Sequence, residues 1–297
     1  MKFPPFLKPG DTIGLVCPAG YMPKEKTNAC IDMLSKWGYK VAIGKTVGGK
    51  SKNYFSGTDE ERLSDLQQFL DNPEINAVLC ARGGYGTTRI IERIHWKQFK
   101  KNPKWIVGFS DITVLHGYLQ KNLEIASIHG PMAGAFHASR SNTKYIHSLK
   151  DALEGKEQII YARNHKFNIH GQVSAPISGG NLCLLAHGIG SSTEIDTRNK
   201  ILFIEDIGEQ LYNIDRMMYQ LKNAGKLSRL KALLVGGFSD CKDTERPFGK
   251  KAYEIIRDCV AQYNYPKAFG FPISHEKENM AIVLGKSYDL RVSHDGA

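Results

Sequence analysis

The chain has 297 residues and a formal net charge of +10, from 40 lysines and arginines against 30 acidic residues. This length is enough to bury the core of two domains or of one large α/β domain. A positive charge can indicate a nucleic-acid partner, but the basic residues are scattered, with only short clusters such as "HWKQFKKNPKW", and no nucleic-acid motif accompanies them. We therefore interpret the charge as a solvated surface and expect no nucleic-acid partner.

The six cysteines show neither a C-x-x-C pair nor a regular spacing. Several lie in apolar runs such as "GLVCPA" and "GNLCLL", where a free cysteine behaves as a small buried hydrophobic residue. This usage argues against a zinc site and a disulfide framework and is typical of a reducing compartment. The N-terminal segment has two prolines where a signal peptide needs an apolar stretch, and no apolar run reaches the length of a membrane span. We expect a cytoplasmic protein with no membrane partner.

In the first half of the chain, short runs rich in valine, isoleucine and leucine alternate with longer amphipathic segments. This alternation predicts strand–helix units around a mainly parallel sheet, and strands so short and apolar suit a sheet covered on both faces. The predicted strands are 12–19, 40–43, 77–81 and 105–109, and the predicted helices are 24–37, 59–70, 87–94 and 113–123.

The pattern changes near residue 156, where the chain becomes polar, alternating and poor in helix formers. We place a connection at 161–175, which divides the chain into an N-terminal α/β domain, 1–160, and a smaller α/β C-terminal domain, 176–297. In the second domain, the same reasoning predicts strands at 200–206 and 232–239, helices at 213–225 and 250–263, and further apolar segments at 267–275 and 281–292. Two such lobes would place an active site at their interface.

The first candidate site follows the strand 105–109, where "WIVGFSDITVLH" turns polar at Ser110 and Asp111. One interpretation is a helix cap, because serine and aspartate satisfy free backbone N–H groups at a helix start. The other is a nucleophile on a tight strand-to-helix turn, where Gly108 lets the backbone bend sharply. This stretch alone leaves both open.

A glycine-rich turn in "CARGGYGTTR" also lies between a predicted strand and a predicted helix. Its glycines, Gly83, Gly84 and Gly86, indicate a backbone that approaches a ligand closely, with N–H groups directed at negative charge. The turn lacks the spacing of a dinucleotide fingerprint and the lysine of a phosphate-binding P-loop. It suits an oxyanion hole, since acyl transfer needs two fixed N–H donors.

Two adjacent acids, Glu205 and Asp206, end the apolar run "LFIED". Carboxylates that are buried there are costly without a partner. These two acids therefore either lie in a loop exposed to water, cap the following helix or orient a histidine. His275 and His129 lie in apparent loops, where site residues gather, whereas His116 lies on a predicted helix and suits packing or the surface. No metal-ligand spacing such as H-E-x-x-H occurs, so we expect neither a metal nor another cofactor.

Together these segments resemble the LD-carboxypeptidase family of serine peptidases, which includes muramoyltetrapeptide carboxypeptidases and the microcin C immunity peptidases. The similarity covers nearly the whole chain, and the order and spacing of the matching segments are together specific for the family. The segments are "LKPGDTIGLVCPAG", "NYFSGTDEERLSDLQQFLDNPEINAVLCARGGYG", "GFSDIT", "SGGNL", "LFIEDIGEQLYNIDRM" and "GFPISHEKEN".

The resemblance implies that Ser110 is the nucleophile, His275 the general base and Glu205 the residue that orients it. Acyl-transfer triads on other folds also use this chain order. The resemblance further implies that the oxyanion donors are Gly84 and the amide of Asp111.

The implied substrate is a murein tetrapeptide, cut at the L,D-peptide bond to its terminal D-alanine during cytoplasmic recycling of cell-wall peptides. A homodimer is implied as well. A carboxypeptidase must also hold the terminal carboxylate, and Arg82, beside the glycine turn, is our candidate because a guanidinium can bind it bidentately.

The chain departs from related patterns at two positions. Ile112 stands where the G-x-S-x-G turn of α/β-hydrolases has its second glycine, and Ser274 stands where the family usually has a glycine before the histidine. Two alternatives stay open. One is an immunity-type peptidase that cleaves peptidyl or aminoacyl nucleotides, which needs a tryptophan or tyrosine to stack on the base. The other is a non-catalytic protein that binds cell-wall peptides.

Overall fold

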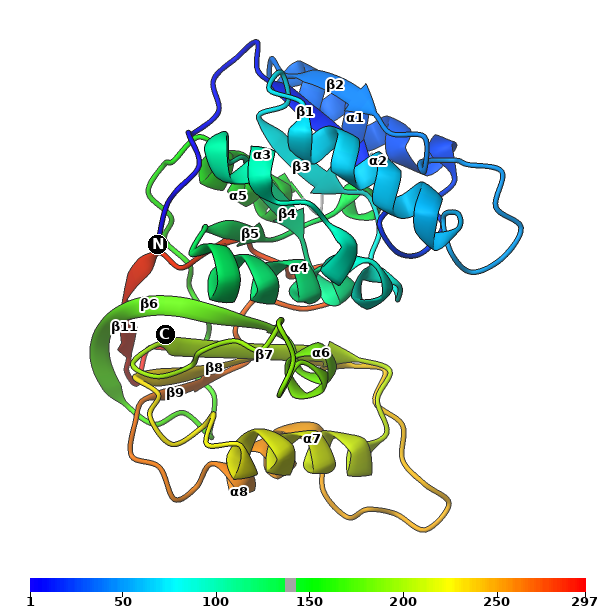
Figure 1. The fold of residues 1–297 in the computed structure, drawn as a ribbon. Helices are drawn as coiled ribbons and strands as arrows, with labels where there is room; N and C mark the ends of the chain where they lie inside the picture. The colour runs from blue at the N-terminus through cyan, green and yellow to red at the C-terminus, as the bar shows by residue number, and fades with distance from the viewer. Residues whose placement is uncertain (137–142) are drawn as a thin grey trace. The chain divides into compact units, whose positions relative to one another are not determined.

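The computed structural model describes residues 1–136 and 143–297, which form an α/β protein with two sheets (Figure 1). The chain divides into two compact units. Unit 1 comprises Met1–Gln158 and Met280–Val283, and unit 2 comprises Ile159–Asn279 and Leu284–Ala297. The two-domain α/β architecture expected from the sequence is thus confirmed.

The observed units differ in two places from the boundaries that the sequence suggests. Strand β6 begins at Gly171, inside the segment 161–175 that we expected to be a connection. Met280–Val283 belongs to unit 1, although it lies near the end of the chain. There Ala281 donates its amide to Ser148 Oγ at 2.9 Å and accepts a hydrogen bond from Gln158 Nε2 at 3.1 Å.

Unit 1 is built on a six-stranded, mainly parallel sheet in the order β10-β5-β4-β3-β1-β2. Every residue of β3 and β4 is buried, as expected for strands covered on both faces. The strands of this sheet are β1 (Thr12–Val16), β2 (Lys40–Ile43), β3 (Ala77–Cys80), β4 (Trp105–Gly108), β5 (Ser127–His129) and β10 (Ile282–Leu284).

The helices of unit 1 cover both faces of its sheet. The α-helices are α1 (Asn28–Lys36), α2 (Asp59–Asp71), α3 (Lys97–Lys101), α4 (Thr113–Tyr118) and α5 (Thr143–Leu153). The short helical turns are η1 (Lys24–Thr27), η2 (Thr87–Arg89), η3 (Ile91–Arg93), η4 (Ser110–Ile112), η5 (Leu119–Leu123) and η6 (Ala133–Ala135). The segment 87–94, expected to be one helix, forms two 3-10 turns, because five of its eight residues are β-branched and disfavour an α-helix.

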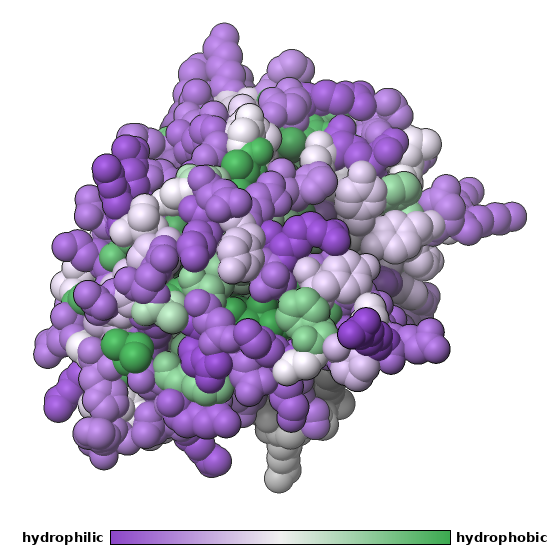
Figure 2. All heavy atoms as spheres, turned by 90° about the horizontal axis from the view of Figure 1, so that it is seen from below, coloured by the Kyte–Doolittle hydropathy of each residue, from purple (hydrophilic) through white to green (hydrophobic). Residues whose placement is uncertain are grey.

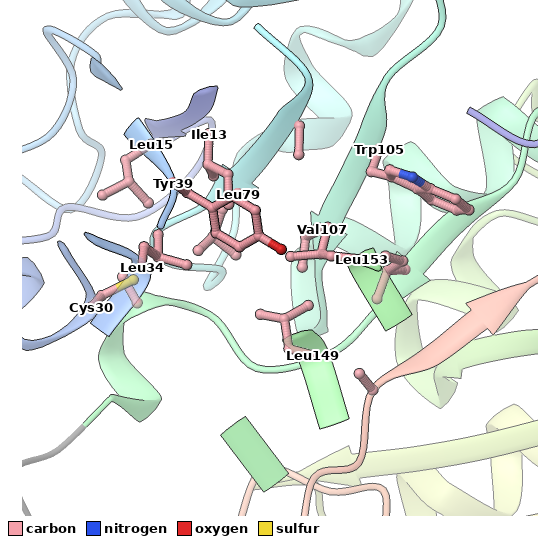
Figure 3. Close-up of a cluster of buried hydrophobic side chains, with 14 of the residues drawn as sticks. Ile13, Leu15, Cys30, Leu34, Tyr39, Leu79, Trp105, Val107, Leu149 and Leu153 are labelled. Atoms are coloured by element: carbon pink, nitrogen blue, oxygen red, sulfur yellow. The ribbon is translucent and has the colours of Figure 1, made fainter. Parts of the chain in front are cut away.

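The main hydrophobic core of unit 1 lies between the sheet and the helices α1 and α5 (Figure 3). Its central side chains include Ile13 and Leu15 from β1, Leu79 from β3, Val107 from β4, Leu34 from α1, and Leu149 and Leu153 from α5. On β1, Gly14 leaves room for α2, because a Cβ atom there would lie 2.1 Å from Cδ1 of Phe69.

Unit 2 contains a five-stranded mixed sheet in the order β11-β6-β7-β8-β9, in which only β11 is antiparallel to its neighbour. Its helices share one hydrophobic cluster with the sheet, and α7 and α8 lie beside each other in Figure 1. The strands are β6 (Gly171–Asn181), β7 (Ile201–Ile207), β8 (Ala232–Ser239), β9 (Lys267–Phe269) and β11 (Ser287–Val292), and the helices are α6 (Leu182–His187), α7 (Leu211–Asn223) and α8 (Ala252–Cys259).

The face of the molecule seen in Figure 2 is mainly hydrophilic, with hydrophobic residues in small patches. Scattered hydrophobic residues of this kind are normal on a protein surface. Within the described residues, no helix combines the length and the apolarity needed to cross a membrane.

Candidate active site

Ser110 stands on a strained turn directly after the buried strand β4. Its φ is +61°, a left-handed conformation that costs on the order of 1 kcal/mol or more for a residue with a Cβ atom. In the described part of the chain, neither η4 nor α4 has a side-chain capping hydrogen bond at its start. The structure thus gives no support to the capping interpretation, and a strained residue between strand and helix is the geometry that exposes a nucleophile.

His116, on α4, supports the end of β4. Its Nε2 atom lies 2.9 Å from the carbonyl oxygen of Gly108, and its Nδ1 atom lies 2.8 Å from Ser127 Oγ. Burial lowers the pKa of His116 to about 4, so the ring is neutral near pH 7 and donates from Nε2 to Gly108. His116 is therefore a packing residue, as expected, and His129 at the end of β5 is fully buried as well.

The glycine-rich turn lies directly against Ser110. A Cβ atom on Gly83 would come 2.9 Å from Ser110 Cβ and 3.3 Å from the amide nitrogen of Asp111, so this approach requires glycine. Gly84 has a φ of +95°, which glycine adopts without strain. The structure therefore brings the turn that contains Gly84 together with the turn that contains Ser110 and Asp111. The sequence assigned no specific role to Gly83, which makes the closest contact.

Arg82, in the same turn, has an exposed side chain. Its Nη1 atom donates a hydrogen bond of 2.7 Å to the backbone oxygen of Tyr21. A guanidinium has five N–H donors, so this bond still leaves donors for a carboxylate.

In unit 2, His275 and Glu205 form a close pair. His275 Nδ1 lies 2.6 Å from Glu205 Oε2, and the side chains are 11% and 0% exposed. Burial by itself lowers the pKa of His275, but the hydrogen bond to Glu205 and the negative charges of Glu205 and Asp206 outweigh it, so the pKa is raised. Because the carboxylate holds the proton on Nδ1, Nε2 is the basic nitrogen.

The pairing of β7 with β8 is irregular at Glu205. Strands β7 and β8 pair in register up to Ile204 and Val235, and the pairing resumes at Asp206 and Phe238. Glu205 alone therefore faces two residues of β8. The extra residue makes this a bulge in β8, and bulges are common next to active sites.

The two residues of β8 that face Glu205 are Gly236 and Gly237. A Cβ atom on Gly236 would come 2.2 Å from the oxygen of Ile273, and one on Gly237 would come 2.4 Å from Ser274 Cβ. The glycine pair thus lets the loop before His275 lie against β8, where Gly237 donates its amide to Ile273 at 2.8 Å.

Ser274, the residue that departs from the family pattern, stabilises the loop that carries the histidine. Its hydroxyl donates to the oxygen of Glu278 and accepts from the amide of Glu276, both at 3.0 Å. A serine before His275 is therefore compatible with an ordered loop.

Asp206, the second acid of the "IED" segment, has a structural role. Its carboxylate accepts hydrogen bonds from Asn181 Nδ2 at 2.7 Å and from the amides of Ile207 and Cys183 at 2.8 and 2.9 Å. Burial raises the pKa of Asp206 to about 7 although these bonds oppose the shift. Asn181 in turn caps α6 by accepting from the amide of Leu184 at 3.2 Å. Apart from the segment "SGGNL", which contains Asn181, no local pattern in the sequence predicts this network.

Unit 1 thus carries a strained serine beside a glycine-rich turn, and unit 2 carries a histidine with a buried carboxylate partner. Acyl transfer requires a nucleophile, oxyanion donors and an oriented base, and these features are of the kinds that it requires. Among residues 1–136 and 143–297, no group of three or more His, Cys, Asp or Glu side chains is arranged to hold a metal ion.

Comparisons with known proteins agree with this set of components. Residues 13–130 match the family model described as the LD-carboxypeptidase N-terminal domain, and residues 174–290 match the one described as the LD-carboxypeptidase C-terminal domain. The chain is 34% identical to the probable murein peptide carboxypeptidase of Bacillus subtilis (strain 168), over 95% of this chain and 89% of that one. It is 26% identical to the microcin C7 self-immunity protein of Escherichia coli, over 93% and 89% of the two chains.

Among solved structures, the chain is similar to the muramoyltetrapeptide carboxypeptidase from Oxalobacter formigenes. The TM-score is 0.84 at 28% sequence identity, and the match covers 96% of each chain. The resemblance noted from the sequence is therefore confirmed.

Proposed function

Because the chain belongs to the LD-carboxypeptidase family, we propose that it is a serine-type LD-carboxypeptidase that releases the terminal D-alanine of murein tetrapeptides. The observation that carries the proposal is the 2.6 Å hydrogen bond between His275 Nδ1 and the buried Glu205. A serine hydroxyl needs such an oriented histidine as its base. The names of the similar proteins from Bacillus subtilis and Oxalobacter formigenes support the choice of substrate.

The proposed mechanism assigns Ser110 as the nucleophile and His275 as its general base. His275 Nε2 accepts the proton of Ser110 while Oγ attacks the scissile carbonyl, and Glu205 stabilises the imidazolium that forms. The amides of Gly84 and Asp111 donate to the developing oxyanion. His275 then protonates the leaving amine of D-alanine, and a water molecule that it activates hydrolyses the acyl-enzyme.

Arg82 is the proposed anchor for the terminal carboxylate of the substrate. Its position in the glycine-rich turn puts a cation in the same turn as the proposed oxyanion donor Gly84. The side chain is exposed, and its Nη1 atom donates to the backbone oxygen of Tyr21. Other N–H groups of the guanidinium can therefore make a bidentate contact with a carboxylate.

The cellular setting is also part of the proposal. The absence of paired cysteine motifs from the sequence supports a reducing, cytoplasmic compartment, where the enzyme would act in the recycling of cell-wall peptides. The family resemblance supports a homodimer whose substrate is a small peptide.

A second candidate function is cleavage of an aminoacyl or peptidyl nucleotide, as in the immunity-type relatives. Tyr54 and Tyr85, two exposed tyrosines of unit 1, favour this second function. The Tyr54 hydroxyl lies so close to the glycine-rich turn that a Cβ atom on Gly84 would be 2.7 Å from it. An aromatic ring at this place can stack on a nucleobase, but it serves equally to pack against a peptide.

Mass spectrometry of parallel incubations separates these functions. The substrates are murein tetrapeptide, tripeptide and pentapeptide and an aminoacyl sulfamoyl adenosine, and the control is Ser110→Ala. We expect only the tetrapeptide to be shortened by one alanine, and only with the unmodified enzyme. Cleavage of the nucleotide alone would favour the second function, and binding without cleavage would favour a non-catalytic peptide-binding protein.

A further inference from the structure

Arg62, on α2, is a fully buried arginine whose guanidinium contacts the glycine-rich turn. Its Nη1 atom donates to the backbone oxygens of Pro18 at 2.5 Å and of Gly86 at 3.0 Å. Its Nη2 atom pairs with Asp59. One side chain thus ties the segment after β1 to the turn after β3.

Asp111, the residue after the proposed nucleophile, reaches the same turn from the other side. It is 1% exposed, and its Oδ2 atom accepts a hydrogen bond of 2.8 Å from the amide of Thr87. The oxygen of Gly86 and the amide of Thr87 belong to one peptide group. A buried cation therefore contacts the carbonyl end of this peptide, and a buried anion contacts its N–H end.

We propose that Arg62 and Asp111 are positioning residues that hold the Gly86–Thr87 peptide between them and thereby fix the glycine-rich turn against Ser110. This inference rests on the proposed function, because the turn matters for catalysis only if it supplies an oxyanion donor. The connection to the nucleophile is direct in the chain, since Asp111 follows Ser110.

The electrostatics of the two residues support a positioning role. Burial raises the pKa of Asp111, and hydrogen bonds from Thr87, followed by the charge of Arg62, oppose that shift. Burial lowers the pKa of Arg62, and the charges of Asp59 and Asp111 oppose it. Each residue thus favours the charged form of the other across the peptide group.

A contribution to stability alone does not account for this arrangement. Within the described residues, Arg62 Nε and Asp111 Oδ1 are buried without a hydrogen-bond partner, so the two charges are only partly compensated. Well-packed apolar side chains are often at least as stable as a buried ion pair. What the charges add is orientation, because an ionised donor and an ionised acceptor make strong, directional bonds to the peptide.

The expected consequence is an effect on turnover and not on substrate affinity. Oxyanion donors act only if they lie at hydrogen-bond distance from the position of the oxyanion. A displacement of about 1 Å can cost about 100-fold in rate. Releasing the peptide group allows such a shift, because Gly83 and Gly84 have no Cβ atoms to restrict the turn.

The test compares Arg62→Met and Arg62→Lys with Arg89→Met. Arg89 is the matched control, since its Nε atom also pairs with Asp59, at 2.9 Å, but its side chain is 48% exposed. We expect Arg62→Met to lower kcat on tetrapeptide by about 10-fold to 100-fold with KM within about threefold. Arg62→Lys, which keeps a cationic donor, should restore part of kcat, and Arg89→Met should leave it unchanged. Equal kcat for Arg62→Met and the unmodified enzyme overturns the proposal.

Two further measurements do not depend on the peptide substrate. One is hydrogen exchange of the Thr87 amide, followed by NMR, which should be slow in the unmodified protein and in Asp111→Asn, fast in Asp111→Ala, and intermediate in Arg62→Lys, which keeps a cationic donor. The other is the rate at which a fluorophosphonate modifies Ser110, which needs an oxyanion hole but no murein peptide. It should fall in Asp111→Ala and be largely kept in Asp111→Asn.

The outcomes distinguish the two proposals. Fast exchange of Thr87 and slow phosphonylation in the variants, in a protein that does not cleave tetrapeptide, would refute the proposed substrate and keep the positioning role. Unchanged exchange and unchanged phosphonylation in Asp111→Ala and Arg62→Lys would overturn the positioning role, whichever peptide is cleaved. These variants also serve as the test if Arg62→Met does not fold.

Discussion

The Nδ1 atom of His275 lies 2.6 Å from Oε2 of Glu205, and the carboxylate is fully buried. A buried carboxylate is costly unless it is paired, and a charge-assisted hydrogen bond offsets much of that cost. Because Glu205 raises the pKa of His275 and is itself buried, the loss of either residue should have effects at the site that exceed the loss of a single contact.

The first prediction is that Ser110, His275 and Glu205 act as one unit. Ser110→Ala and His275→Ala should each lower kcat on the order of 10⁴-fold, because either change removes nucleophilic catalysis, and the double variant should add little. Turnover of tetrapeptide is the measurement, and circular dichroism is the control for folding. Normal turnover by either single variant would rule out the triad.

The second prediction concerns the pH dependence of kcat/KM. The general base must be neutral, so activity should be lost as the pH falls through the pKa of His275, which Glu205 raises above its ordinary value. Glu205→Gln removes the negative charge, so the acidic limb of the profile should move to lower pH. In a plot of kcat/KM against pH, the acidic limb reports the pKa of the general base in the free enzyme.

Glu209→Gln is the control for this shift. Glu209 is close to the same strand end, but its carboxylate accepts from Asn213 Nδ2 at 3.2 Å instead of from the histidine. Its profile should match that of the unmodified enzyme. If Glu205→Gln and Glu209→Gln give the same profile, Glu205 does not control the histidine.

The third prediction is that the free carboxylate of the substrate is required. A site that pairs a cation with this group rejects an analogue without it strongly, because the cation loses its partner. We expect the C-terminal amide of the tetrapeptide to be cleaved at least about 100-fold more slowly, or about 2.7 kcal/mol in transition-state stabilisation. Arg82→Ala should remove most of this difference.

The cleavage rates of the tetrapeptide and of its C-terminal amide, measured for the unmodified enzyme and for Arg82→Ala, test the activity and the role of Arg82 separately. Equal rates for the unmodified enzyme would contradict a carboxypeptidase. Strong discrimination that persists in Arg82→Ala would contradict only the assignment of Arg82.

The fourth prediction concerns stability and His116. Burial lowers its pKa in the folded protein to about 4, below the ordinary value of 6.5, so between these pH values the unfolded chain binds more protons. The contribution of His116 is therefore present above pH 6.5 and is lost as the pH falls towards 4, by about 2 kcal/mol between pH 7.5 and 5. Urea unfolding at both pH values, compared with the non-titrating His116→Gln, measures this difference. An equal loss in both proteins would show that His116 does not titrate in this range.

The elements that the sequence predicts correctly are those with strong local patterns. Strands 40–43 and 232–239 coincide with β2 and β8, because both are short apolar runs rich in β-branched or aliphatic residues. The strand Gly171–Asn181 has no comparable local signal, since it contains three glycines and one proline, residues that are unfavourable inside a strand. Its pairing with β7 and β11 determines its structure.

The candidate site is predictable only in part for the same reason. Ser110 and the glycine-rich turn follow predicted strands, so their chemistry can be inferred locally. The pairing of His275 with Glu205 depends on the bulge in β8 and on the close approach at Gly236, which join segments 70 residues apart. The choice of His275 among ten histidines came from the family resemblance. Arg62 gives no signal, because an arginine on an amphipathic helix is typical of a solvated surface.

Hydrolysis of murein tetrapeptide in water enriched in ¹⁸O tests the central claim most directly. Mass spectrometry of the products should find unlabelled D-alanine together with a tripeptide that carries ¹⁸O in its new carboxylate, because water attacks the acyl group held by Ser110. The same incubation with Ser110→Ala should leave the tetrapeptide intact. An intact tetrapeptide with the unmodified enzyme, or an equal yield of tripeptide with Ser110→Ala, would contradict the assignment of a serine-type LD-carboxypeptidase.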